Sequence, residues 1–131
     1  MLMKYIVLSG ISQMALKNLE QNKVKTIEIR SPHNFLSAIE THVGDVIFLT
    51  TTSMEDVGVG TKGYIAKILE KQVSMHRIIH QTDELFEEAE VQMARLKLEM
   101  KGHARVRRSI CCAMGEPIIA DADEVQFFEG R

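Results

Sequence analysis

Tryptophan is absent from this chain of 131 residues, and aromatic residues make up only 5% of it. Broad stacking platforms for nucleic-acid bases are therefore not expected. An excess of one charge is also lacking, because the formal net charge is −2, so any nucleic-acid binding must come from a local basic patch. Hydrophobic residues at 45% and charged residues at 26% are typical of a folded globular protein, and the length suits one domain over residues 1–131.

Long apolar runs are missing too. None approaches the ~20 residues that a membrane-spanning helix needs, and the segment Met1–Leu8 is too short and lacks the cleavage region of a signal peptide. The two cysteines, Cys111 and Cys112, are adjacent, and neighbouring cysteines rarely bridge each other. Reduced thiols fit a cytosolic protein. We therefore expect a cytoplasmic protein with no membrane partner, in which both cysteines are buried as small hydrophobic side chains.

Hydrophobic periodicity predicts short strands interspersed with a few helices. Strands are expected at residues 5–8, 25–30, 46–49, 63–69 with a continuation to 79, 94–100, 117–119 and 125–128. Helices are expected from Ile11 to about Asn22, from the Ser31-Pro32 start signal onward, and over the acidic segment 82–90. The second of these helices would bury a stripe formed by Phe35, Leu36, Ile39 and Val43. The pattern predicts an α+β fold, a small curved sheet or pseudo-barrel with two to three short helices.

The strand Lys25–Arg30 is the first candidate for a site. Alternation places Thr26, Glu28 and Arg30 on one face and the isoleucines on the other, so an acid and a base share a rigid open face. Lys25 has the parity of the isoleucines and joins the charged pair only if the strand twists or bulges at its start. A solvated strand face is the alternative interpretation.

A second polar element follows the buried strand at 46–49. The chain turns there from aliphatic residues to the hydroxyl run Thr50–Ser53, and glycines occur in the loop beyond it. Hydroxyls and backbone amides near glycine can hold phosphate or carbonyl groups. We therefore expect Thr52 and Ser53 to enter a ligand cleft.

These residues carry a family resemblance. The segment Lys25–Arg30 resembles the G-x-K-x-x-E-x-R signature of the ASCH group in the PUA-like superfold, with Lys23 in place of the glycine. Gly44–Leu49 is similar to the G-D strand of that group, and Gly63–Ile68 resembles its next strand, so the likeness covers roughly residues 19 to 70. The whole chain also resembles an uncharacterised archaeal family of unknown function.

The ASCH resemblance implies a small pseudo-barrel whose cleft binds RNA or modified bases. Carried over by position, Lys25, Glu28 and Arg30 would line that cleft. Some family members are amidohydrolases of acetylated cytidine with the sequence K-T-I-T-I-R here, in which the lysine and the second threonine are catalytic. Glu28 replaces that threonine, so the amidohydrolase interpretation loses a catalytic group, although a carboxylate can act as a general base. No catalytic residue is assigned.

A basic stripe is the second candidate. If the strand at 94–100 continues past Gly102, one face would carry a row of cations that could follow a phosphate backbone: Arg95, Lys97, Lys101, Arg105 and Arg107, with His103 among them. The alternative is a solvated face balanced by the acidic segment 82–90. His76 and His80 would share a face, as zinc ligands do, only on a helix, and this segment is expected to be a strand. The two cysteines lack C-x-x-C spacing, so we expect no metal and no cofactor.

Three functions from different classes are compatible with this sequence. The leading hypothesis is a non-enzymatic PUA-like module that binds RNA or a nucleotide in a cleft lined by Lys25, Glu28 and Arg30. The alternatives are a small amidohydrolase acting on a modified nucleoside, and a structural or interaction protein that uses its charged stripes to form a homo-oligomer.

Overall fold

A computed structural model describes residues 3–110 and 117–125 of the chain. It shows an α+β fold with a curved six-stranded sheet, which confirms the fold class expected from the sequence. Cys111 and Cys112 lie outside the described residues, as does most of the strand expected at 125–128. The elements in chain order are β1 (Met3–Leu8), α1 (Gln13–Asn22), β2 (Val24–Ile29), α2 (Pro32–Ile39), β3 (Val46–Leu49), the 3-10 helix η1 (Met54–Asp56), β4 (Lys62–Gln81), β5 (Phe86–Ile110) and β6 (Ile118–Val125).

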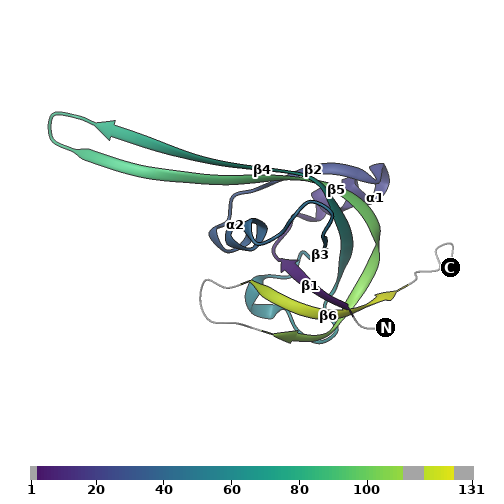
Figure 1. Cartoon of the computed structure of the whole chain (residues 1–131). Coiled ribbons are helices and arrows are strands. Elements are labelled where there is room, and N and C mark those ends of the chain that lie inside the picture. The colour runs from purple at the N-terminus through teal and green to yellow at the C-terminus, as the bar shows by residue number, and fades with distance from the viewer. Residues whose placement is uncertain (1–2, 111–116, 126–131) are drawn as a thin grey trace.

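The sheet closes on itself through its longest strand (Figure 1). The strand order is β2-β5-β4-β3-β1-β6, and β6 pairs again with β5, so β5, β4, β3, β1 and β6 form a barrel. One edge of β5 is shared: its residues 94–99 pair with β2 and its residues 103–110 pair with β6. Strand β2 therefore lies outside the barrel, and its other edge carries no strand within the described residues.

The two faces of the sheet bury separate cores. The barrel interior contains Phe48, Ile65, Ala104 and Val106, together with two residues of β1 and three of β6: Tyr5, Val7, Ile118, Ala120 and Ala122. The outer face is covered by α1 and α2 and buries residues from both helices and from β2, β3, β4 and β5. Neighbouring residues such as Ile65 and Ala66 thus belong to different cores, as expected for a strand buried on both faces.

A β-bulge at Lys101 exchanges the two faces of β5. Ile65 pairs with Gly102 whereas Ala66 pairs with Met100, so Lys101 is an extra residue in the ladder. Leu96 and Leu98 consequently pack beneath the helices, while Ala104 and Val106, at the same parity, point into the barrel. Side chains of equal parity before and after Lys101 therefore lie on opposite faces.

The hairpin of β4 and β5 extends beyond the barrel as a two-stranded arm (Figure 1). The helix expected over residues 82–90 is wrong, because residues 86–91 pair with β4 and Thr82–Leu85 form the hairpin turn. The Thr82 hydroxyl accepts a hydrogen bond from the Leu85 backbone N–H at 3.0 Å, which is the bond that a helix N-cap would accept. The hydrogen bond that would cap a helix at Thr82 therefore closes the hairpin turn instead.

Helix α2 begins where the sequence predicts and buries a different face. Ser31 is its N-cap and Pro32 its first residue, as expected. The helix ends at Ile39 and buries Phe35 and Ala38, whereas Leu36, Ile39 and Val43 are exposed, so the predicted apolar stripe is wrong except at Phe35.

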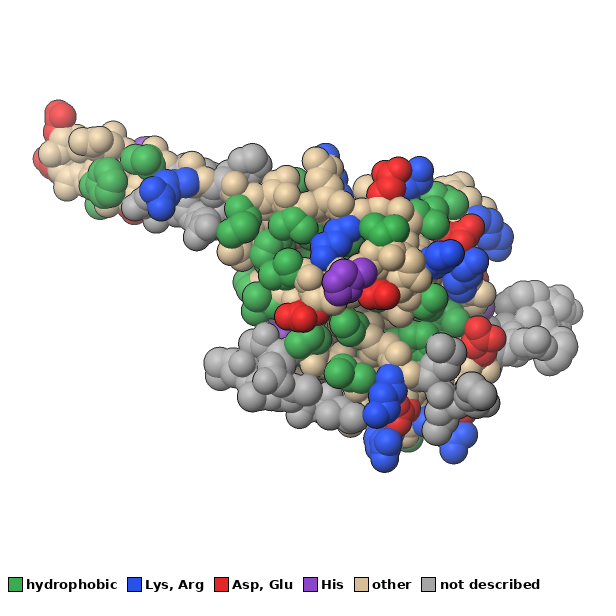
Figure 2. All heavy atoms as spheres, in the orientation of Figure 1, with side chains coloured by type: hydrophobic (Ala, Val, Ile, Leu, Met, Phe, Trp, Pro, Cys, Tyr) green, Lys and Arg blue, Asp and Glu red, His purple; other side chains and the backbone are tan. Residues whose placement is uncertain are grey.

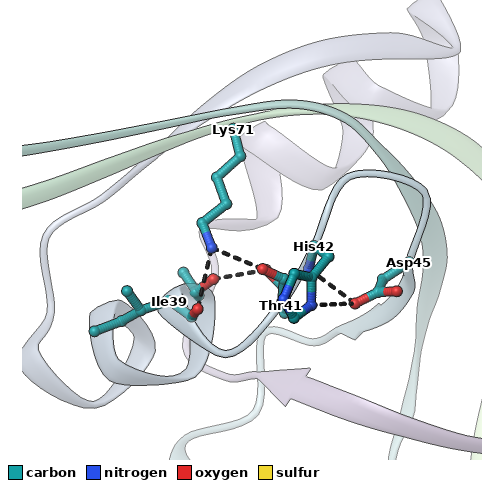
Figure 3. Close-up of polar contacts among 6 residues, drawn as sticks. Ile39, Thr41, His42, Asp45 and Lys71 are labelled. Atoms are coloured by element: carbon teal, nitrogen blue, oxygen red, sulfur yellow. Dashed lines mark hydrogen bonds and ion pairs between the residues drawn. The ribbon is translucent and has the colours of Figure 1, made fainter.

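The Lys71 side chain of β4 donates to backbone carbonyl groups at the end of α2 and just beyond it (Figure 3). The Lys71 ammonium donates to the Thr41 carbonyl oxygen at 2.7 Å and to the Ile39 carbonyl oxygen at 3.1 Å. Carbonyl groups at a helix C-terminus lack partners within the helix and carry partial negative charge, so a cation is favourable there. Lys71 therefore ties β4 to the end of α2.

Candidate ligand-binding cleft

A cleft of about 400 Å³ runs along the free edge of β2. One wall is the strand itself with the two residues that follow it, and the opposite wall is the start of α1, the loop before it and the start of α2. Its lining residues are Gly10, Ile11, Ser12, Ala15, Asn34 and all of 25–31. The cleft therefore includes Lys25, Glu28 and Arg30, the three residues that the sequence analysis placed together.

Lys25 reaches the cleft without a bulge. Strand β2 pairs with β5 in unbroken register from Val24 to Ile29, and Ile27 and Ile29 are buried beneath the helices, so Lys25 lies on their face. Glu28 lies on the other face, opposite Arg95. Because the cleft follows the edge of the strand, it receives side chains from both faces, and the condition of a twist at the strand start is unnecessary.

Two arginines hold the carboxylate of Glu28. Arg95 donates to its Oε1 from Nε at 3.3 Å and from Nη2 at 3.2 Å, and Arg30 Nη2 lies 3.7 Å from its Oε2. These side chains are 44–65% exposed, so the ion pairs contribute little to folding stability. Their consequence is positional: Glu28 and Arg30 are held side by side in the lining of the cleft, and both carboxylate oxygens already have a partner.

The opposite wall is fixed by buried polar contacts. The Asn34 side chain accepts from the Ser9 backbone N–H at 3.1 Å and donates to the Ser9 carbonyl oxygen at 2.7 Å, which joins α2 to the loop after β1. Gly10 has a φ of +61° and turns the chain toward α1. Ser12 and Ser31 are the N-caps of α1 and α2, so the N-termini of both helices border the cleft.

The hydroxyl run after β3 supports this wall from behind. The Thr52 carbonyl oxygen accepts from Gly10 N–H at 2.8 Å, and the Thr50 carbonyl oxygen accepts from Ile11 N–H at 3.0 Å. The Ser53 hydroxyl donates to Asp56 at 2.9 Å. Thr52 and Ser53 are not among the residues that line the cleft, so the expectation that they enter it is wrong. Their direct contact with a ligand has no geometric support.

The basic stripe does not form one face. The bulge at Lys101 turns Arg95 and Lys97 to one side of β5 and Arg105 to the other, so the expected continuous row is wrong. Most of its cations are also paired with carboxylates, and acidic and basic side chains are interspersed over the body of the molecule (Figure 2). The pairs are Arg95 with Glu28, Lys97 with Glu70, Lys101 with Glu99, Arg107 with Asp123 and Arg108 with Asp121. Nucleic-acid binding by these residues stays a prediction.

Sequence reasoning missed a second polar cluster, on the other side of α1. The His103 Nε2 atom lies 2.8 Å from Glu20 Oε2, and the Tyr64 hydroxyl donates to Glu20 Oε1 at 3.5 Å. Burial, together with the charge of Glu20 and this hydrogen bond, raises the pKa of Tyr64 above its usual value of 10.0. The three residues are far apart along the chain and come from α1, β4 and β5, so no local spacing signals them.

Comparison with known families identifies the family of this chain. Residues 3–120 match the family described as "Protein of unknown function (DUF473)". The chain belongs to the DUF473 family. An uncharacterized protein of Methanocaldococcus jannaschii is 33% identical over 104 residues, which is 79% of this chain and 65% of that protein, so the chain spans less than two thirds of its relative. These findings support the expected resemblance to an uncharacterised archaeal family, while the ASCH resemblance stays a prediction.

A solved structure shares the fold of this DUF473 chain. The N-terminal domain of the Mycobacterium avium complex Lon protease superposes with a TM-score of 0.52 over 97% of this chain and 57% of that one. The sequence identity is 14%, so the likeness concerns the fold alone.

Metal-ligand clusters and membrane-spanning helices are both absent from the described part of this DUF473 chain. Within residues 3–110 and 117–125, no group of three or more His, Cys, Asp or Glu side chains is arranged to hold a metal ion. No helix in the same ranges has the length and apolar character needed to cross a bilayer.

Proposed function

We propose that this DUF473 chain binds RNA or a nucleotide in the cleft along β2. The observation that carries the proposal is the assembly of Lys25, Glu28 and Arg30 in one cleft of about 400 Å³ at the free edge of a strand. Ligand pockets typically measure about 300–1,000 Å³, so a nucleotide-sized molecule fits this space.

The chemistry of the lining suits a phosphorylated base. Lys25 and Arg30 supply cationic donors for phosphate oxygens, and arginine binds phosphate in a bidentate manner. The carboxylate of Glu28 accepts from amino or hydroxyl groups, as carboxylates do when they read exocyclic amines of bases. Ile11 and Ala15 add apolar surface against which a planar ring can pack.

The strand edge adds a second kind of recognition. Along an edge strand, alternate backbone N–H and C=O groups point away from the sheet without a partner strand. The cleft is lined by residues 25–29 of β2, so the backbone groups on the unpaired edge of this strand are available to a bound ligand. Backbone donors and acceptors at fixed spacing favour a ligand with many polar edges, which is the property of a nucleobase.

The decisive experiment measures binding of a fluorescently labelled single-stranded RNA oligonucleotide by anisotropy over a series of salt concentrations. We expect affinity to fall steeply with salt, and Arg30→Gln to weaken binding about fivefold to tenfold, the effect of losing one partly exposed charge-assisted hydrogen bond. Arg77→Gln, an exposed arginine on the arm, is the matched control and should leave affinity unchanged. No binding at low salt, or equal affinity of the Arg30→Gln variant, refutes the proposal.

A further inference from the structure

A second cavity, of about 390 Å³, lies on the side of α1 that faces away from the β2 cleft. Ser12 and Ala15 of the α1 region border the β2 cleft, whereas Leu16, Lys17 and Glu20 border this pocket. Helix α1 therefore separates two concave sites. The pocket is lined by Gln13, Leu16, Lys17, Glu20, Thr51, Lys62, Gly63, Tyr64 and His103, and the function proposed above makes no use of it.

The wall on the barrel side is a fixed pair of rings. Tyr64 and His103 are cross-strand partners of β4 and β5, with ring centroids 4.8 Å apart and planes inclined by 49°. Glu20 contacts both rings, at 2.8 Å from His103 Nε2 and 3.5 Å from the Tyr64 hydroxyl oxygen. This wall is held in place before a ligand arrives. The described lining of the β2 cleft includes no aromatic residue, so the two sites differ in kind.

Cations that have no carboxylate partner among the described residues lie in and beside the pocket. Lys17 of α1 and Lys62 of β4 approach it from opposite walls, and Arg105 is the cross-strand partner of Lys62 on the same face of the sheet. Within the described residues, none of the three has an ion-pair partner, in contrast to the paired cations elsewhere on β5. Glu20, the carboxylate of the pocket, is engaged by His103.

We propose that this pocket is a second ligand site, and that its ligand is a planar ring that bears a phosphate group. The ring packs on Tyr64, and the phosphate is bound by Lys62 and Lys17 with Arg105 at the rim. Aromatic side chains stack on any planar base, and ammonium groups bind phosphate as point charges. Gln13 and Thr51 supply amide and hydroxyl groups for the edge of the ring.

Isothermal titration calorimetry with adenosine monophosphate tests the proposal. Adenosine and inorganic phosphate are the reference ligands, because they test the binding of the ring and of the phosphate separately. We expect adenosine monophosphate to bind more tightly than either adenosine or inorganic phosphate. Lys62→Gln should weaken its binding about fivefold to tenfold, while Lys4→Gln, at an exposed lysine that lines neither this pocket nor the β2 cleft, should not. Tyr64→Leu should weaken it about tenfold through lost stacking, and Tyr64→Phe should restore it.

Tyr64 is partly buried against the core, so circular dichroism must show that each variant is folded. If Tyr64→Leu unfolds the protein, the exposed residue Lys62 decides alone. Equal affinity of Lys62→Gln and Lys4→Gln for adenosine monophosphate and for a single-stranded RNA oligonucleotide overturns the proposal. If Lys62→Gln loses affinity only for the oligonucleotide, the result supports a pocket that binds a ring and phosphate of an RNA strand. If Lys62→Gln loses affinity for adenosine monophosphate, the result supports a pocket that binds a free nucleotide.

The two sites fail independently. Arg30→Gln changes the β2 cleft and should leave binding in this pocket unchanged, because α1 lies between them. Loss of adenosine monophosphate binding in Arg30→Gln but not in Lys62→Gln overturns the second site and supports the β2 cleft.

Discussion

Replacing Lys71 with methionine is expected to destabilise the protein at the junction of the arm and α2. Methionine keeps the unbranched stem of the side chain and removes the ammonium group. The change deletes the hydrogen bonds to the Ile39 and Thr41 carbonyl oxygens, at 3.1 and 2.7 Å (Figure 3). Thr41 is fully buried, whereas Ile39 is 43% exposed, so water can easily replace only the bond to the Ile39 carbonyl oxygen.

The magnitude follows from these two environments. A hydrogen bond to a charged group contributes about 1.5–3 kcal/mol, and the exposed bond is largely replaced by water. We therefore expect the free energy of unfolding to fall by about 1.5 kcal/mol. For 131 residues, the entropy of unfolding is about 0.28 kcal/mol per kelvin, so the melting temperature should fall by about 5 °C.

Differential scanning calorimetry and urea unfolding measure this change directly. Lys67→Met is the matched control, because Lys67 lies on the same strand, is half-buried, and its side chain makes no hydrogen bond within the described residues. We expect the control to shift the melting temperature by less than about 2 °C. An unchanged melting temperature in Lys71→Met, or an equal shift in both variants, refutes the conclusion that Lys71 caps α2.

Three further perturbations test the fold around the two sites. Gly63→Ala should cost at least about 2 kcal/mol or prevent folding, because the added methyl group would overlap a β3 carbonyl oxygen and an aromatic ring, whereas Gly58→Ala, with open space, should be nearly neutral in urea unfolding. Asn34→Ala should lower the unfolding free energy by about 2–3 kcal/mol through two lost buried bonds, and a loss below about 0.5 kcal/mol would contradict that role. Tyr64 should ionise above pH 10.0 in the folded protein, so the stability that is present below that pH is lost as pH rises through the raised pKa. Because Glu20 contributes to the raised pKa, the ultraviolet absorbance of tyrosinate should appear at lower pH in Glu20→Gln, and an unchanged titration curve would contradict the contribution of Glu20.

The alternative functions keep their own tests. Turnover of acylated nucleosides by the native chain, lost in Glu28→Gln, would favour an amidohydrolase, and equal rates would remove Glu28 from such a mechanism. A homo-oligomer held by charged stripes should change its sedimentation with salt, and a monomer at every salt concentration would count against it.

Local sequence determined several features of this protein correctly. The alternation in β2 placed Ile27 and Ile29 in the core and Glu28 and Arg30 on the open face, because side chains of a strand change sides at every residue. The Ser31-Pro32 start signal placed the first turn of α2, because capping involves only residues three positions apart. Both signals act over a few residues, and the α+β class follows from their sum.

Tertiary structure decided the features that depend on partner strands. The bulge at Lys101 arises in the pairing of β5 with β4, and it reverses the side chains from Gly102 to Val106, so counting parity along the sequence could not place Arg105. The capping signal at Thr82 closes a hairpin because β4 was available to pair with the acidic segment. Lys25 reaches the cleft because β2 is an edge strand, which only the sheet order reveals.

The two candidate sites show the same division. Lys25, Glu28 and Arg30 lie within six consecutive residues, so the ASCH resemblance could propose them together from one strand, and their role as a ligand site stays a prediction. Glu20, Tyr64 and His103 meet only after α1 packs on the barrel and β4 pairs with β5. Contacts between distant segments are set by closure of the sheet and burial of the helices. Because sequence patterns report only neighbouring residues, they could not predict the second pocket.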